Sequence, residues 1–207
     1  MVARCERTSE LGICVSTAAL AVGSVVPHIE LDVAAIATQA TTNVIYGIKG
    51  LRLMKLGLTP SNALDTLLRE DEKRETRQVI MIDKDGRTAA FTGEETVEWK
   101  GHLVGTNYAT AGNMLAGSQV IEAMAKTFES TDGPLEERLM QVLEAGQRAG
   151  GDKRGKVSAA LLVRKRIAVA SMRPWIDLRV DEHPDPVAEL RRIYEIFKAR
   201  YLAVGKS

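Results

Sequence analysis

Two short strings place glycines and polar residues beside apolar segments. The first is 111–117, Ala-Gly-Asn-Met-Leu-Ala-Gly, and the second is 150–160, Gly-Gly-Asp-Lys-Arg-Gly-Lys-Val-Ser-Ala-Ala. Glycine lets the backbone approach a ligand or adopt a positive φ. Where a strand meets a loop or a helix, backbone N–H groups are free to bind an anion or a developing oxyanion. The two strings together indicate a polar site at strand ends, of the kind a hydrolase uses, whereas turn formation is the simpler interpretation of either one alone.

The polar residues of these strings suggest specific roles. Asn113, with the backbone N–H of Met114, is a candidate oxyanion donor because it follows a predicted strand and precedes a predicted helix; the alternative is an Asn that completes a turn. Asp152 and Arg154 form a charge pair that can hold the amine and the carboxylate of a ligand, since Arg suits bidentate contacts. Their alternative role is a loop ion pair of little energetic weight. Ser158 would face the same site from the start of the next strand.

A second group of polar residues lies in the first quarter of the chain. Ser24 and His28 fall in a predicted loop, where a lone His is either a catalytic group or a packing residue. Thr38, Gln39 and Asn43 interrupt an otherwise apolar stretch. Because buried polar side chains need partners, these three either line a cavity or hold strands together. We treat all five as candidate substrate-binding residues.

Composition excludes several classes of function. The chain has 207 residues, 45% of them apolar, which fits a single domain over 1–207 with a continuous core. The net charge of +1 and an aromatic content of 4% disfavour a nucleic-acid partner. The stretch 31–48 carries Asp32 and several Thr, Gln and Asn residues, which does not fit a membrane span. Charge precedes any apolar run at the N-terminus, so we expect no signal peptide and a cytoplasmic location.

The cysteines and histidines show no metal-ligand spacing. Cys5 and Cys14 are expected to be reduced and to pack as small apolar residues, since neither has a CxxC partner. His28, His102 and His183 are scattered along the chain. We therefore expect neither a metal nor an organic cofactor.

Hydrophobic periodicity predicts the elements that must position these residues. Strands are predicted at 2–5, 11–16, 33–39, 78–82, 88–92, 107–112, 157–164, 167–171 and 175–181, and helices at 46–56, 62–69, 118–128, 134–148 and 186–202. Asp85-Gly86 marks a hairpin. The helices come in pairs instead of alternating with strands, which argues against a doubly wound parallel sheet. The pattern predicts an α+β fold, a four-layer αββα sandwich of two antiparallel sheets between helical layers.

Several strings, in order along nearly the whole chain, resemble the DUF1028 family. They are 20–27 (Leu-Ala-Val-Gly-Ser-Val-Val-Pro), 37–40 (Ala-Thr-Gln-Ala), Tyr-Gly at 46–47, 111–115, 151–155 with 158–160, and 177–181 with His-Pro at 183–184. That family is similar in fold to the N-terminal nucleophile (Ntn) hydrolases, an αββα superfamily that includes proteasome subunits and γ-glutamyltransferases. The resemblance implies hydrolysis of a small amide by an N-terminal Thr, Ser or Cys, whose own α-amine is the base.

The start of the chain departs from the family pattern. Members typically open with Thr-Phe-Ser-Ile before a Val-Ala-Arg stretch; here Val-Ala-Arg is present at 2–4 and Met1 stands where that Ile would be. Two expectations compete: the natural protein carries the Thr upstream of Met1, or this is a non-catalytic relative that binds a small molecule or acts in an assembly. Cys5 is the least favoured nucleophile, because it requires cleavage after Arg4 and would shorten the first strand.

The resemblance also adds Ser16 to the candidate catalytic residues. It lies at the end of the second predicted strand, where the superfamily places residues beside the nucleophile; the alternative is a hydroxyl that faces solvent. A homodimer is expected as well, because Trp99 and Trp175 fall near polar edges and related folds self-associate.

Overall fold

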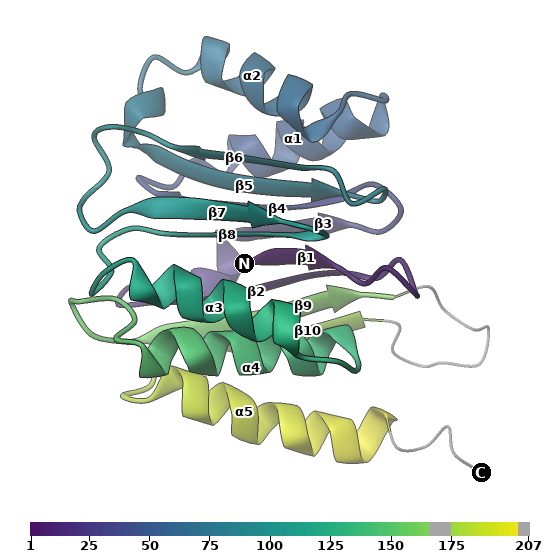
Figure 1. Ribbon diagram of the computed structural model, residues 1–207, viewed down its shortest axis with the longest axis vertical. Helices are drawn as coiled ribbons and strands as arrows, with labels where there is room; N and C mark the ends of the chain where they lie inside the picture. The colour runs from purple at the N-terminus through teal and green to yellow at the C-terminus, as the bar shows by residue number, and fades with distance from the viewer. Residues whose placement is uncertain (166–174, 203–207) are drawn as a thin grey trace.

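The computed structural model describes residues 1–165 and 175–202. The predicted strand at 167–171 and the side chain of Trp175 lie outside the described residues. Two antiparallel sheets form the centre of the molecule (Figure 1). The larger sheet has the order β10-β9-β2-β1-β8-β7, and the smaller sheet has the order β3-β4-β5-β6.

The strands of the larger sheet are β1 (Val2–Arg4), β2 (Leu11–Thr17), β7 (Gly101–Gly105), β8 (Tyr108–Gly112), β9 (Ser158–Arg164) and β10 (Trp175–Val180). Those of the smaller sheet are β3 (Pro27–Glu30), β4 (Ala34–Ala40), β5 (Arg77–Asp83) and β6 (Thr88–Thr92). The helices are α1 (Ile45–Lys55), α2 (Pro60–Glu70), α3 (Gln119–Ser130), α4 (Leu135–Arg148) and α5 (Pro186–Phe197). Short 3-10 turns occupy Val22–Ser24 and Arg74–Thr76, and a π-helical turn at Lys198–Leu202 follows α5.

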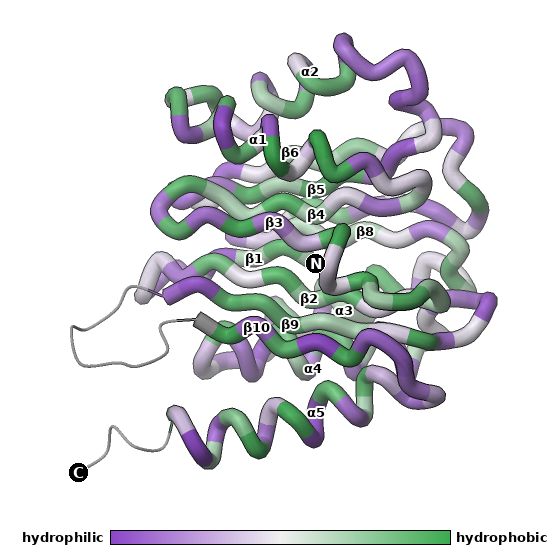
Figure 2. The backbone as a smooth tube through the Cα atoms, turned by 180° about the vertical axis from the view of Figure 1, so that it is seen from behind, coloured by the Kyte–Doolittle hydropathy of each residue, from purple (hydrophilic) through white to green (hydrophobic). Residues whose placement is uncertain are grey.

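Three apolar layers hold the molecule together, which confirms the predicted αββα sandwich. The two sheets bury Ile13, Ile80 and Ile82 between them. The helices α1 and α2 cover the outer face of the smaller sheet, and α3, α4 and α5 cover that of the larger sheet (Figure 1). The hydropathy colouring shows apolar residues concentrated in the central strands, whereas α5 alternates between polar and apolar positions (Figure 2). Amphipathic helices on sheets that are apolar on both faces produce this arrangement.

The structure contains two strands that the periodicity did not predict. All four residues of β3 are only partly buried, and β7 exposes Leu103 and Val104. Both are edge strands, which lack the alternation of buried and exposed residues that marks a strand in a sequence. His28 consequently lies on a strand and not in a loop.

Candidate active site

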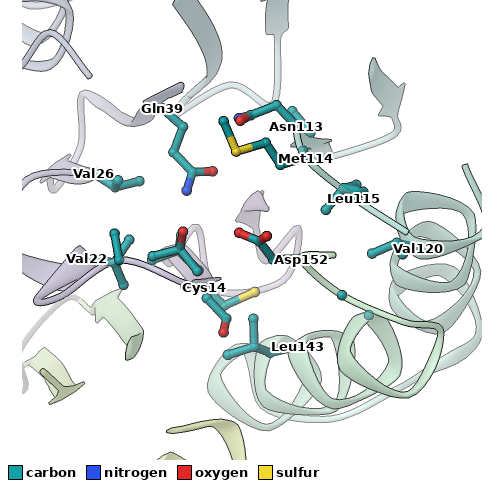
Figure 3. A pocket seen from close by; sticks show the side chains of 18 of the residues that line it. Cys14, Val22, Val26, Gln39, Asn113, Met114, Leu115, Val120, Leu143 and Asp152 are labelled. Atoms are coloured by element: carbon teal, nitrogen blue, oxygen red, sulfur yellow. The ribbon is translucent and has the colours of Figure 1, made fainter. Parts of the chain in front are cut away.

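A cavity of about 200 Å³ lies beyond the N-terminal end of β1, in the middle of the molecule (Figure 3). Its walls come from β2, β8, the loop that follows β2, the first turns of α3, the end of α4 and the loop 150–155. Elements from both halves of the sequence therefore meet at one place.

The structure brings the two glycine-rich strings side by side at this cavity. Leu115 and Asp152 form an antiparallel bridge, and the Ala116 N–H donates to the Gly151 carbonyl at 3.0 Å. The Lys153 N–H donates to the Met114 carbonyl at 2.8 Å. Three glycines in 150–155 adopt positive φ, a conformation that L side chains rarely take. The glycines thus make the turns that let one loop pair with the other.

Asp152 and Arg154 form a two-pronged ion pair on the cavity wall. The Arg154 Nη2 lies 2.5 Å from one carboxylate oxygen of Asp152, and its Nε lies 3.0 Å from the other. The carboxylate also accepts the N–H groups of Arg154 and Ala18. Burial favours the neutral acid, but the bonds from Arg154 outweigh it and hold the pKa of Asp152 below its usual value. The Asp152 side chain is 10% exposed and that of Arg154 is 45% exposed, so the pair stays ionised where ligand can reach it.

Gln39 points into the cavity from β4 of the smaller sheet (Figure 3). Within the described residues, its side-chain amide makes no hydrogen bond with the protein. An amide has two donors and one acceptor available for a ligand. Gln39 is therefore the predicted polar residue whose side chain is most free to bind.

Asn113 also lines the cavity, but its side chain is anchored from the opposite sheet. Its amide nitrogen donates to the Gln78 Oε1 at 3.0 Å. Gln78 lies on β5, is 2% exposed, and donates in turn to the Gly112 carbonyl at 2.8 Å. Gln78 thus fixes the end of β8 and the orientation of the Asn113 side chain. The second N–H of the Asn113 amide remains available.

The expectation for the backbone of Met114 requires correction. Met114 has a φ of 55°, and its N–H donates to the Val97 carbonyl at 2.9 Å. The N–H is therefore already paired and does not serve as an oxyanion donor. The side chain of Met114, in contrast, extends into the cavity (Figure 3).

Ser16 and Ser158 have different positions relative to the cavity. Ser16 lines it, with its hydroxyl donating to the Ser158 carbonyl at 3.2 Å. Ser158 is fully buried; its hydroxyl donates to the Ala19 carbonyl at 2.6 Å and accepts the Val22 N–H at 3.0 Å. Ser158 is thus corrected from a substrate-binding residue to one that holds the loop after β2.

Ser24 and His28 do not line the cavity. The Ser24 hydroxyl donates to the Ala21 carbonyl at 2.7 Å within an exposed turn. The His28 ring packs against Gly47 of α1, where an added Cβ would lie 2.1 Å from the ring. Burial lowers the pKa of His28. His28 is thus a packing residue between β3 and α1, as the alternative interpretation had it.

Thr38 and Asn43 are also outside the cavity. The hydroxyl of the fully buried Thr38 donates to the Asn43 carbonyl at 3.3 Å. The Asn43 side-chain oxygen accepts the Ile45 N–H at 3.1 Å and so starts α1. Both residues connect β4 to α1, which corrects their assignment as substrate-binding residues.

Met1 and Cys14 were missed as cavity residues, although they define its shape. The Met1 ammonium donates to the Cys14 carbonyl at 2.9 Å, and the Cys14 N–H donates to the Met1 carbonyl at 3.1 Å. Beyond this pair, β2 and β8 continue on either side of the cavity, as the registers of Val2 with Ile13 and with Ala109 show. We call the space between β2 and β8 beyond Met1 the slot. Only the strand register could have identified these residues.

The cavity has two compartments, one on each face of the larger sheet. The apolar compartment faces α3 and α4 and is lined by Cys14, Leu115, Val120, Met124 and Leu143. The inter-sheet compartment is lined by Val22, Val26, Gln39 and Ala40. Burial raises the pKa of the Cys14 thiol, so it is a neutral apolar group here.

No cluster of three or more His, Cys, Asp or Glu side chains suited to a metal ion occurs in the parts of the chain that the structure describes. Among those same residues, every helix is too short or too polar to cross a membrane.

The chain is thus an αββα sandwich with a cavity at the start of a central strand. A family model matches residues 1–190, and the chain belongs to that family, DUF1028, described as a family of unknown function. The chain is similar to a DUF1028 protein from Silicibacter pomeroyi of known crystal structure, with 32% identity and a TM-score of 0.88 over 95% of this chain and 84% of that chain. The predicted family is thus confirmed.

A weaker likeness is to Anbu (ancestral beta-subunit) from Yersinia bercovieri, at 8% identity and a TM-score of 0.41 over 96% of this chain and 93% of that chain. A likeness of this size supports no conclusion about function. No curated protein matches the chain.

Proposed function

We propose that this protein is an Ntn-type hydrolase that cleaves a small amide or related C–N bond by acyl transfer. One observation carries the proposal: the cavity continues the line of β1, and it is there that a nucleophile preceding Met1 would lie. Gln39, Asn113 and the Asp152–Arg154 pair surround that position.

The strand register supports the Thr-Phe-Ser opening of the family. Side chains alternate between faces along a strand, and Met1 packs toward α3 and α4 whereas Val2 packs between the sheets. The second residue before Met1 would therefore face the apolar compartment, which suits a Phe ring. The third residue before Met1 would face the inter-sheet compartment, which brings a Thr hydroxyl toward Gln39.

The proposed reaction uses the residues around the slot in order. The α-amine of the nucleophile, with an ordinary pKa of about 8, takes the hydroxyl proton as the oxygen attacks the carbonyl carbon. The amides of Gln39 and Asn113 donate to the oxyanion, in place of the paired Met114 N–H. The amine leaving group takes the proton as the C–N bond breaks, and water then hydrolyses the ester. Asp152 and Arg154 orient charged groups of the substrate.

A protein extended by Thr-Phe-Ser before Met1 tests this function. We expect hydrolysis in a panel of small amides and a single covalent adduct by intact mass with an amide-reactive electrophile. The same extension with Ala in place of the Thr is the matched control and should give neither. A folded Thr-initiated protein with no adduct and no hydrolysis would rule the proposal out.

The second candidate function is non-catalytic binding of a small molecule, which the unpaired Gln39 amide favours. A ligand that binds the native state raises Tm, so a thermal-shift screen of amides, amino acids and small peptides on residues 1–207 tests it. The homodimer and the cytoplasmic location remain predictions, and sedimentation analysis of the purified chain would test the first.

A further inference from the structure

We propose that His102 and Thr92 are positioning residues, which act on Asn113 through Gln78 and respond to protonation of the His102 ring. Their importance for catalysis rests on the proposed function, in which the Asn113 amide donates to the oxyanion. The coupling between His102 and Asn113 does not itself require hydrolysis. It follows from a continuous chain of side-chain hydrogen bonds that leads from an exposed position on an edge strand to the cavity wall.

This chain of bonds passes through both sheets. The Thr92 Oγ1 lies 2.9 Å from the His102 Nδ1, and the Gln78 Nε2 donates to the same Thr92 oxygen at 3.1 Å. The Asn113 amide nitrogen donates to the Gln78 Oε1 at 3.0 Å. His102 lies on β7 and Asn113 follows β8, whereas Thr92 and Gln78 lie on β6 and β5. The chain of bonds therefore leaves the larger sheet, crosses two strands of the smaller sheet and returns.

Gln78 is the central member of the chain of bonds, and both polar atoms of its amide are used. Besides Thr92, its Nε2 donates to the Gly112 carbonyl at 2.8 Å and to the Gly101 carbonyl at 3.2 Å. An amide nitrogen has only two hydrogens, so these three acceptors share them. Because Gln78 is 2% exposed, water cannot readily replace a lost partner. A change at Thr92 therefore alters how Gln78 is held, and with it the oxygen that orients Asn113.

The Thr92 hydroxyl selects one form of the His102 ring. Because the Thr92 oxygen accepts from Gln78, its own proton is available to the His102 Nδ1. This arrangement requires the neutral ring with its proton on Nε2. Burial lowers the pKa of His102, which favours the neutral ring at pH 7.

Protonation of His102 would reverse its bond to Thr92. The Nδ1 then becomes a donor, so the Thr92 oxygen would have to accept from both His102 and Gln78 while its own proton turns away. Two donors compete for one oxygen, which weakens the bond from Gln78. His102 is exposed and exchanges protons with solvent. We therefore expect Asn113 to be held most firmly above the pKa of His102 and to loosen as pH falls through it.

The surroundings of His102 contain few charges that could dominate its protonation. His102 shares the inter-sheet face with Ala111 of β8 and bonds Thr92 of β6, both uncharged, whereas α3 covers the opposite face of the larger sheet. The charged residues nearest to this pair along the chain are Lys100 and Glu94. They pair with each other, with 3.9 Å between Nζ and Oε2, so their charges largely offset each other at the ring.

NMR titration of residues 1–207 from about pH 8 to about pH 5, the range in which His titrates, tests the coupling. We expect the Asn113 side-chain amide resonances to shift with the same midpoint as the His102 ring. His102→Asn places a non-titrating acceptor near the position of Nδ1, and there the Asn113 shift should vanish, which separates it from titration of the N-terminal amine. Asn113 resonances that ignore the His102 titration, or that shift unchanged in His102→Asn, would overturn the inference.

Substitutions at Thr92 test the path of the coupling. Thr92→Val keeps the shape of the side chain and removes the hydroxyl, so His102 should still titrate while Asn113 no longer responds. Thr92→Ser returns the hydroxyl and should restore the response. Thr88→Val, four residues earlier on β6, is the matched control and should behave as the parent does. An unchanged Asn113 response in a folded Thr92→Val protein would overturn the inference.

Kinetics of the Thr-initiated protein separate this inference from the hydrolase proposal. Thr92→Val should lower kcat on the order of fivefold with little change in KM, because the oxyanion forms only after substrate is bound, and Thr92→Ser should recover it. A Thr-initiated protein that shows the NMR coupling but no hydrolysis contradicts the hydrolase and supports the coupling. An active protein whose kcat is the same in Thr92→Val contradicts the positioning role and supports the hydrolase.

Discussion

The Asp71–Arg77 and Asp152–Arg154 pairs both have a carboxylate with little exposure, and they differ in what surrounds the Arg. Arg77 is 9% exposed in its side chain; it bonds Asp71 through Nε at 2.8 Å and the Thr41 carbonyl at 2.7 Å. Arg154 is 45% exposed and bonds Asp152 on the wall of the cavity. Both carboxylates have a lowered pKa. A perturbed pKa therefore does not distinguish a structural pair from a ligand-binding one, whereas access to a cavity does.

Tyr46 adds a third member to the Asp71–Arg77 pair, which we call the structural pair. Its hydroxyl donates to Asp71 at 3.1 Å, and burial together with the Asp71 charge raises the pKa of Tyr46. The cluster therefore joins α1, the end of α2 and the start of β5. Its groups all have protein partners, which leaves none for a ligand.

The largest expected effect on the free energy of unfolding comes from loss of the structural pair. Arg77→Met leaves the Asp71 carboxylate beside Tyr46 without its cation, and we expect the free energy of unfolding to fall by about 3 kcal/mol. Urea denaturation of the variant and its parent measures the difference. A loss no larger than that of Arg154→Ala would break the contrast between the two pairs.

The same pair should dominate the acid sensitivity of folding. The hydrogen bond from Arg77 lowers the pKa of Asp71 to about 2, below its unfolded value. The resulting stabilisation is complete above the unfolded pKa of about 4 and is lost as pH falls toward 2. Stability measured from pH 5 to pH 2 should fall less steeply in Arg77→Met than in the parent. Identical slopes would contradict the role of Asp71.

An intermediate effect is expected at the loop that forms one cavity wall. Ser158→Ala removes the partner of the Ala19 carbonyl and of the Val22 N–H, both held in the loop after β2. We expect a loss of about 1 to 2 kcal/mol in unfolding free energy, because a buried donor and acceptor are left unpaired. Ser24→Ala, in an exposed turn, is the control and should be close to neutral. A neutral Ser158→Ala would mean that water replaces the hydroxyl.

Loss of the Asp152–Arg154 pair should affect ligand binding more than the free energy of unfolding. Arg154→Ala should change the unfolding free energy by less than about 1 kcal/mol, since the Arg154 side chain is 45% exposed and solvent screens its ion pair. Without Arg154, the Asp152 carboxyl should titrate at a higher pH, which NMR can follow. Hydrolysis by the Thr-initiated protein should fall on the order of tenfold, and unchanged hydrolysis would remove this pair from the site.

The smallest stability effect is expected at Gln39. Gln39→Ala removes an amide that has no protein partner among the described residues, so thermal unfolding should hardly change. Hydrolysis by the Thr-initiated protein should nevertheless fall roughly a hundredfold. Gln78→Ala is the informative comparison. It removes the hydrogen bonds to the Gly112 carbonyl and from Asn113 at the end of β8, so both stability and hydrolysis should fall. Equal activity of Gln39→Ala and its parent would exclude Gln39 as an oxyanion donor.

Local signals in the sequence were sufficient for the layers of the fold. Paired amphipathic helices and the Asp85-Gly86 hairpin predicted the αββα sandwich, because periodicity and turn chemistry act over a few residues. The edge strands β3 and β7 were missed, since partial exposure removes the alternation on which prediction depends.

The candidate site was only partly predictable. The glycines of the two strings determined where the chain could turn, and Asp152, Arg154, Asn113, Gln39 and Ser16 do line one cavity. Thr38 and Gln39 are neighbours of similar polarity, yet only Gln39 reaches the cavity. Neighbouring strand residues point to opposite faces, so register decides which one faces a ligand.

The sequence by itself determined the alternation of apolar and polar residues, the turns, and hence the four layers. Tertiary structure alone decided that β1 ends between β2 and β8, that Met1 and Cys14 border a slot, and that the Met114 N–H is already paired. The physical reason is that hydrogen-bond partners and cavity walls come from segments far apart in the chain. Their meeting depends on strand register and layer packing, which no local pattern encodes.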